Sequence, residues 1–233
     1  LVVRPDVLLL DEPLSNLDAK LRVELRGEIR RICKSAGITT VYVTHDQKEA
    51  LSMADRVAIM TMGKVEQLGG PAELYRRPGS KFVAEFLGET NFLPGRVVGR
   101  EGGREGERTI VETPFGRLAS AAPGPRSGPL SGPMSGPEVI VSIRPEALRV
   151  VSNGTGRESH EPGNALAGSV LETTYLGELA QHVVELKPAP GAAAKPQRLK
   201  VALLNPAPAD HAPGPARPIT LHVAPEDVVL VPA

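Results

Sequence analysis

Apolar positions in the first 88 residues follow two different spacings. Val7 to Leu10 is an unbroken apolar run of strand length, and residues 38–45 form a second, β-branched run. Between these runs, apolar residues recur every three or four positions: Leu21, Leu25, Ile29 and Ile32. This spacing predicts an amphipathic helix that ends near Gly37. We therefore expect two parallel strands, each covered on both faces, joined by a helix.

Beyond Gly88 the pattern changes to short apolar runs between stretches rich in glycine and proline. Such runs are typical of a small β-barrel or sandwich, and they occur at residues 95–99, 108–114 and 138–145. The change divides the chain into a first domain, residues 1–88, and a second domain, residues 89–233.

The second domain contains an internal repeat. Residues 143–151 and 223–231 share a Pro-Glu frame with the pattern hydrophobic-x-Pro-Glu-x-hydrophobic-x-hydrophobic-Val. The frame indicates two related halves. Three proline-rich segments lack the residues needed for a core and are expected to be mobile loops, at residues 120–137, 187–196 and 205–218.

Composition excludes several classes of function. The 27 Lys and Arg residues balance 27 Asp and Glu residues, and aromatic residues make up only 3% of the chain, so we expect no nucleic-acid partner. Cys33 is the single cysteine and cannot form an intrachain disulfide. No apolar run reaches the length of a membrane span, so any role at a membrane would need a partner.

The first apolar run ends in two adjacent carboxylates, Asp11 and Glu12. At the carboxyl edge of a parallel sheet, one carboxylate can hold Mg²⁺ while its neighbour orients or deprotonates an attacking water. An acidic turn after a strand is the alternative interpretation. His45 favours the first, because it ends the next strand and is expected to lie beside the carboxylates.

The segments from Leu8 to Arg22 and from Thr39 to Gly69 closely resemble the second half of the nucleotide-binding subunit of ATP-binding cassette (ABC) importers. The resemblance implies that Asp11 is the Walker B aspartate, which binds Mg²⁺, and that Glu12 activates water for ATP hydrolysis. His45 matches the switch histidine that contacts the γ-phosphate.

The same resemblance assigns Ser15, Asn16 and Asp18 to the D-loop, which contacts the nucleotide site of a second copy of the subunit. It implies a homodimeric ATPase that binds transmembrane permease subunits on the cytoplasmic face of the plasma membrane. Residues 69–97 and 168–186 extend the resemblance to importers with a C-terminal TOBE domain of two OB-like halves. The fold class is thus a partial P-loop-type α/β domain followed by an all-β TOBE domain.

Spacing in residues 86–97 is most similar to polyamine importer ATPases, with iron and sugar importers close. The chain contains no G-x-x-x-x-G-K-[ST] phosphate loop and no signature motif followed by a helix, so we expect it to be part of a longer subunit. Whether this chain alone is an enzyme stays open, and we expect it to bind no ATP tightly. The alternative is a separate TOBE module that binds a regulatory ligand or dimerises.

Overall fold

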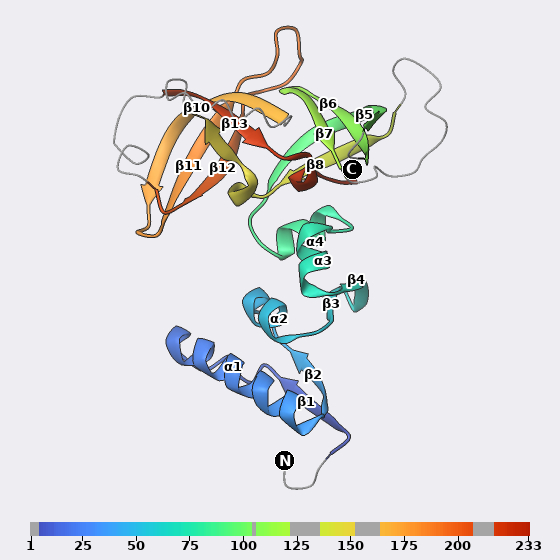
Figure 1. Cartoon of the computed structure of the whole chain (residues 1–233), viewed down its shortest axis with the longest axis vertical. Coiled ribbons are helices and arrows are strands. Elements are labelled where there is room, and N and C mark those ends of the chain that lie inside the picture. The colour runs from blue at the N-terminus through green and yellow to red at the C-terminus, as the bar shows by residue number, and fades with distance from the viewer. Residues whose placement is uncertain (1–4, 104–105, 122–135, 152–163, 207–216) are drawn as a thin grey trace. The chain divides into compact units, whose positions relative to one another are not determined.

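The computed structural model describes residues 5–103, 106–121, 136–151, 164–206 and 217–233. By its contacts the chain divides into two compact units, coloured along the chain in Figure 1. The first unit contains residues 1–78 and 86–88, and the second contains residues 79–85 and 89–233.

The first unit is built on two parallel strands, β1 (Val7–Asp11) and β2 (Thr39–Val43), which pair so that Asp11 lies opposite Val43. Helix α1 (Ala19–Ala36) connects them, as the apolar spacing predicted. The remaining elements follow in the order α2 (Gln47–Met53), β3 (Val57–Thr61), β4 (Lys64–Gly69) and α3 (Pro71–Arg76), and α4 (Lys81–Phe86) comes next in the chain.

Local chemistry sets where the first two helices begin and end. The Asp18 carboxylate accepts a hydrogen bond of 3.0 Å from the Leu21 N–H and so caps α1. Gly37 ends α1 in the left-handed conformation, with φ at 65°, which glycine adopts at little cost. Asp46 caps α2 by accepting hydrogen bonds from the N–H groups of Lys48 and Glu49.

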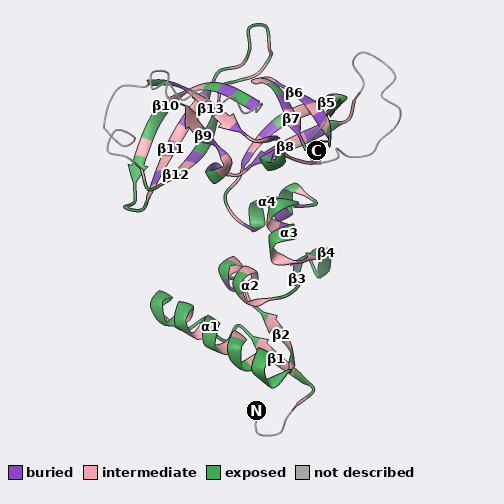
Figure 2. Ribbon diagram, viewed as in Figure 1, coloured by how far each residue is buried: buried purple, intermediate pink, exposed green. Residues whose placement is uncertain are grey.

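The expectation that both faces of these strands are buried is wrong for the described chain. Burial alternates along β1, and the Leu9 side chain is 72% exposed. Val41 and Val43 of β2 are about half exposed as well. The reason is that the described residues of the first unit provide α1 for one face of this sheet and no element for the other. Figure 2 shows the exposed positions along these strands.

The second unit consists of two five-stranded antiparallel sheets, ordered β14-β8-β5-β6-β7 and β12-β11-β10-β13-β9 (Figure 1). The strands of its first half are β5 (Asn91–Gly103), β6 (Gly106–Thr113), β7 (Gly116–Ser120), β8 (Glu138–Ile143) and β9 (Arg149–Val151). Those of its second half are β10 (Asn164–Tyr175), β11 (Leu179–Leu186), β12 (Gln197–Leu204), β13 (Arg217–Val223) and β14 (Val229–Pro232).

The repeated Pro-Glu frames mark an exchange of strands between the two sheets. After β8 a 3₁₀ turn at Pro145–Ala147 carries the chain into the other sheet as β9, and after β13 a turn at Pro225–Asp227 returns it as β14. Each sheet therefore holds four strands of one half and one strand of the other. Apolar residues from both sheets form one core, which includes Leu93, Leu166 and Leu221.

Two buried asparagines occupy equivalent places in this arrangement. Asn91 opens β5, and its side chain donates to the Lys200 carbonyl and accepts from the Lys200 N–H, both at 2.8 Å. Asn164 opens β10 and makes the same pair of bonds with Ala119, at 2.9 and 2.5 Å. Each amide thus joins the first strand of one half to the third strand of the other.

At Gly168, strand β10 lies too close to its neighbour β11 to leave room for a side chain. A Cβ atom on Gly168 would lie 2.7 Å from Cγ1 of Val184 and 2.9 Å from the carbonyl oxygen of Glu185. We expect Gly168→Ala to lower the free energy of unfolding by about 1–3 kcal/mol, measured by denaturant unfolding. Gly99→Ala is the matched control, because a Cβ there meets nothing within 4 Å. Equal losses in both variants would contradict this explanation.

The proline-rich segments lie partly outside the described residues. Residues 122–135 and 207–216, which belong to two of these segments, are outside the described residues. Residues 187–196 are described and connect β11 to β12 without regular structure. The Ala189 N–H donates to the Pro114 carbonyl at 2.9 Å, so this connection contacts the sheet formed by the first half.

Candidate functional site

The parallel pairing of β1 with β2 brings Glu12 and His45 together. Asp11 lies opposite Val43, and the N–H of Glu12 donates to the Val43 carbonyl at 2.9 Å. Nδ1 of His45 lies 3.0 Å from Oε1 of Glu12. The proximity predicted from the two strand ends is therefore present in the structure.

The backbone of Glu12 is in the left-handed region, with φ at 46°. A residue with a Cβ atom pays about 1–3 kcal/mol for such a conformation, and it persists where surrounding contacts impose it. The turn that follows supplies such contacts, since the Ser15 N–H donates to the Glu12 carbonyl and the Leu17 N–H to the Leu14 carbonyl, both at 3.2 Å. Leu14 is buried at 2% exposure and fixes this turn.

The hydrogen bond to Glu12 raises the pKa of His45 above its usual value, and the negative charge of Glu12 adds to the effect. Protonated His45 is thus favoured in the folded chain. The resulting stabilisation is present below the pKa of the unfolded histidine and is lost as the pH rises through the raised folded pKa. Because both side chains are largely exposed, salt will weaken the pair.

An NMR titration of this chain should show the raised pKa of His45 directly. Glu12→Gln should return the pKa of His45 towards its usual value, because the neutral amide removes the carboxylate that favours the imidazolium. An unchanged pKa of His45 in the variant would contradict the contact.

The other predicted site residues lie around this pair with different surroundings. Ser15 lines a small polar cavity of about 10 Å³ together with Glu12 and His45. Asp11 is exposed at the end of β1, and Asn16 is exposed in the following turn. Asp18 does not line the cavity, since its carboxylate caps α1.

The carboxylates suit a magnesium ion that is shared with phosphate groups. Among the described residues, no cluster of three or more His, Cys, Asp and Glu side chains is arranged to hold a metal. Mg²⁺ in nucleotide sites needs only one or two carboxylates, because phosphate oxygens and water complete its shell. Asp11, an exposed residue at the end of β1, fits that requirement.

The sequence did not predict a charged network that adjoins His45 and consists of Arg22, Arg26, Asp46 and Glu49. Glu49 is 3% exposed and accepts hydrogen bonds from the Tyr42 hydroxyl at 3.0 Å and the Thr44 hydroxyl at 2.8 Å. Arg22 and Arg26 of α1 form ion pairs with Glu49, at 3.9 and 3.8 Å. The charges that make Glu49 tolerable in a buried position therefore come from a different helix.

Two further pKa shifts reflect this network. Burial raises the pKa of the Tyr42 hydroxyl, and the hydrogen bond to Glu49 raises it further. Burial alone would raise the pKa of Asp46, but the backbone N–H groups of Glu49 and Lys48 and the Arg26 charge outweigh burial and lower it. Asp46 is therefore ionised where it meets Arg26, at 3.0 Å.

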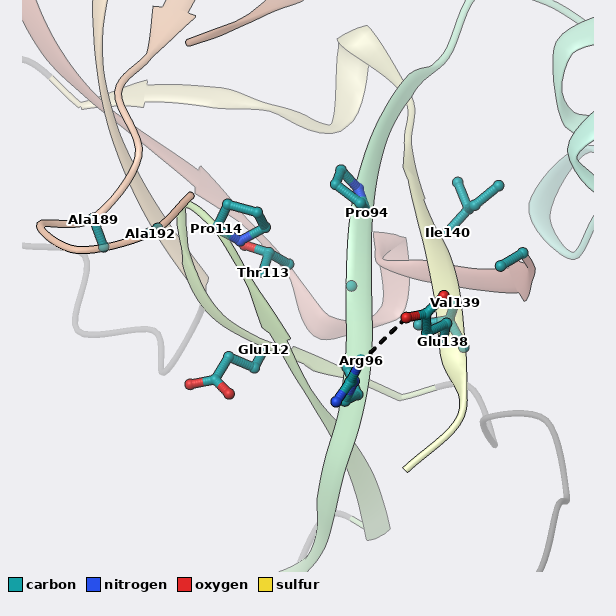
Figure 3. A pocket seen from close by; sticks show the side chains of 12 residues that line it. Pro94, Arg96, Glu112, Thr113, Pro114, Glu138, Val139, Ile140, Ala189 and Ala192 are labelled. Carbon is teal, nitrogen blue, oxygen red and sulfur yellow. Dashed lines mark hydrogen bonds and ion pairs between the residues drawn. The ribbon is translucent and has the colours of Figure 1, made fainter. Parts of the chain in front are cut away.

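The second unit has an open groove of about 530 Å³ on the sheet formed by the first half (Figure 3). Arg96 lies opposite Glu112 on one neighbouring strand and Glu138 on the other, and it forms an ion pair of 3.2 Å with Glu138. The sides are apolar, with Pro94 and Pro114 among the lining residues. Because Glu138 neutralises the arginine, this groove is not an evident anion site.

No described helix is both long and apolar enough to cross a membrane.

Residues 141–231 match the family model of the TOBE domain. The chain is 43% identical over 185 residues to the spermidine/putrescine import ATP-binding protein PotA of Rubrobacter xylanophilus, a match that covers 79% of this chain and 45% of that protein. It is also 43% identical over 185 residues to the Fe(3+) ions import ATP-binding protein FbpC of Agrobacterium fabrum, covering 79% and 46%. The chain therefore carries a TOBE domain and is homologous to the C-terminal part of ABC importer ATP-binding proteins.

The chain spans about half the length of these curated relatives. A solved structure of the cytoplasmic molybdate-binding protein ModG aligns with 61% of this chain and 96% of that chain, with a TM-score of 0.45 and 15% identity. A likeness at that score adds nothing to the fold described above.

Proposed function

We propose that this chain, within an intact subunit, contributes the hydrolytic half of an ABC importer's ATP site and its TOBE domain. The observation that carries the proposal is the 3.0 Å contact of Glu12 with His45 at the ends of adjacent parallel strands. Homology to importer ATP-binding proteins supports it. In this proposal residues 1–88 form the nucleotide-binding part and residues 89–233 form the TOBE part.

Each residue of the site has a distinct role in the proposal. Asp11 would supply a carboxylate oxygen to Mg²⁺, and the bound ion would neutralise phosphate charge. Glu12 orients and deprotonates the attacking water. Ser15, Asn16 and Asp18 belong to the D-loop, which contacts the second copy of the subunit. Ser15, Asn16 and Asp18 are exposed, and one oxygen of the Asp18 carboxylate is already engaged as the cap of α1.

The protonation state of His45 determines whether its Nε2 can donate a hydrogen bond to a phosphate oxygen. A carboxylate can only accept, so Nδ1 of His45 must carry a hydrogen in the bond to Glu12. In the neutral tautomer Nε2 would then be a bare acceptor and would repel a phosphate oxygen. The protonated ring donates from both nitrogens, and the raised pKa of His45 favours that form. His45 is therefore suited to donate from Nε2 to the γ-phosphate.

The transported solute and the cellular location of the subunit are also part of this proposal. The two relatives named above are equally identical to this chain, and one is named for spermidine and putrescine and the other for Fe³⁺. We favour a polyamine because of the spacing in residues 86–97. The subunit would lie on the cytoplasmic face of the plasma membrane, as a homodimer bound to permease subunits.

A separate TOBE module without ATPase activity is the second candidate. The match to the TOBE model and the shared core of the second unit favour it. Phosphate release from Mg-ATP by the intact subunit, compared with its Glu12→Gln variant, distinguishes the two. The ATPase proposal predicts turnover that depends on Glu12, whereas a binding module predicts no turnover in either protein.

A further inference from the structure

His45 is held by the residues on either side of it. The Thr44 hydroxyl donates to Glu49 at 2.8 Å and accepts from the Asp46 N–H at 3.0 Å. The Asp46 carboxylate caps α2 and accepts from Arg22 and Arg26 of α1. The backbone of His45 is therefore fixed relative to α1 by the network and not by its own exposed ring.

Glu12 is fixed relative to α1 by a different route. Its left-handed backbone leads into the turn that ends at Leu17, and the Leu17 carbonyl accepts a hydrogen bond of 3.0 Å from Nη2 of Arg22. Nη1 of the same guanidinium lies 3.4 Å from Oδ2 of Asp46, and its Nε lies 3.9 Å from Glu49. One side chain thus joins the turn after Glu12 to the turn that carries His45.

We propose that Arg22 is a positioning residue that sets the spacing between Glu12 and His45. It contacts the turn on one side and the network on the other, and it lines the cavity between them. The planar, forked guanidinium can hold two acceptors in fixed directions, which a single ammonium cannot. The inference rests on the proposed function for its catalytic meaning, whereas the positioning itself is a property of this chain.

Arg26 provides a matched control. It lies one helical turn further along α1 and reaches the same two carboxylates, with Nη2 at 3.0 Å from Asp46 and 3.8 Å from Glu49. Within the described part of the chain, Arg26 makes no hydrogen bond to the turn after Glu12. Arg22→Met and Arg26→Met therefore each remove one cation from the network, but only the first also releases the Leu17 carbonyl.

ATP hydrolysis by the intact subunit separates positioning from general stability. We expect Arg22→Met to lower kcat about 10- to 100-fold with little change in KM for ATP, since a misplacement of about 1 Å can cost that much. Arg26→Met should keep kcat within about 3-fold of the unmodified subunit. Arg22→Lys should lose less than Arg22→Met, because an ammonium can bond either Leu17 or Asp46. Equal kcat losses in the two Met variants would overturn the proposal.

Amide hydrogen exchange on this chain tests the positioning without any ATPase activity. Arg22→Met should speed exchange of the hydrogen-bonded N–H groups of Ser15 and Leu17 relative to Arg26→Met. Equal exchange at these positions would overturn the proposal. If Arg22→Met fails to fold, Arg22→Lys is compared with Arg26→Lys by the same criterion. An intact subunit without ATPase activity would contradict the proposed function and leave the exchange result as the test of Arg22.

Discussion

Glu12→Gln in the intact subunit should nearly abolish ATP hydrolysis while ATP binding is retained. The amide has almost the same size as the carboxylate and can still accept the hydrogen bond from Nδ1 of His45. It cannot take a proton from water, and loss of a positioned base lowers kcat by about 10² to 10⁴. Steady-state phosphate release gives kcat, and equilibrium binding of Mg-ATP gives the affinity.

Glu28→Gln is the control for the loss of one carboxylate. Glu28 lies on the exposed face of α1 in an ion pair with Arg31, and it contacts none of the site residues named above. The kcat of the Glu28→Gln subunit should equal that of the unmodified subunit. A Glu12→Gln subunit that releases phosphate at the unmodified rate would contradict the role of Glu12.

The double variant Asn91→Ala, Asn164→Ala should lose a large part of the stability of the second unit. Each substitution leaves a backbone N–H and a carbonyl without their side-chain partner, at Lys200 and at Ala119. An unsatisfied buried group costs about 1–3 kcal/mol, so we expect the double variant to lose about 4 kcal/mol or more of unfolding free energy. Denaturant unfolding of this chain measures the loss.

Two comparisons make that result specific. Gln181→Ala removes an exposed hydrogen bond to Glu89 in the same unit and should change stability by less than about 0.5 kcal/mol. The two Asn single variants should add up to the double variant, because the amides act on different strand pairs. A double variant as stable as Gln181→Ala would contradict the role of the two amides.

The local elements of the first unit could be predicted because their signals are local. Four apolar residues mark β1, the three- and four-residue spacing marks α1, and Asp18 and Gly37 mark its ends. The contact of Glu12 with His45 could be predicted because both follow parallel strands, whose ends meet at one edge. The prediction that both faces of β1 are buried was wrong, because an apolar run does not say which other elements are present to cover the strand.

Contacts between distant residues were missed. Arg22 and Glu49 sit in ordinary amphipathic helix patterns, and only the packing of α1 near α2 brings their charges together. The two buried asparagines did have a sequence signal. Residues 91–97 and 164–170 share the pattern N-x-L-x-G-x-V, which a search for repeats could have found. The pattern does not reveal that each amide bonds the other half of the unit.

The most direct test of the proposed function is a crystal structure of the intact, unmodified subunit with a bound non-hydrolysable analogue of Mg-ATP. We expect Nε2 of His45 to lie about 2.6–3.2 Å from a γ-phosphate oxygen, the usual range for a catalytic hydrogen bond. We also expect Asp11 to lie beside Mg²⁺ and Glu12 to face the position of the attacking water. A structure in which the γ-phosphate contacts neither strand end, with His45 turned away from it, would contradict the account.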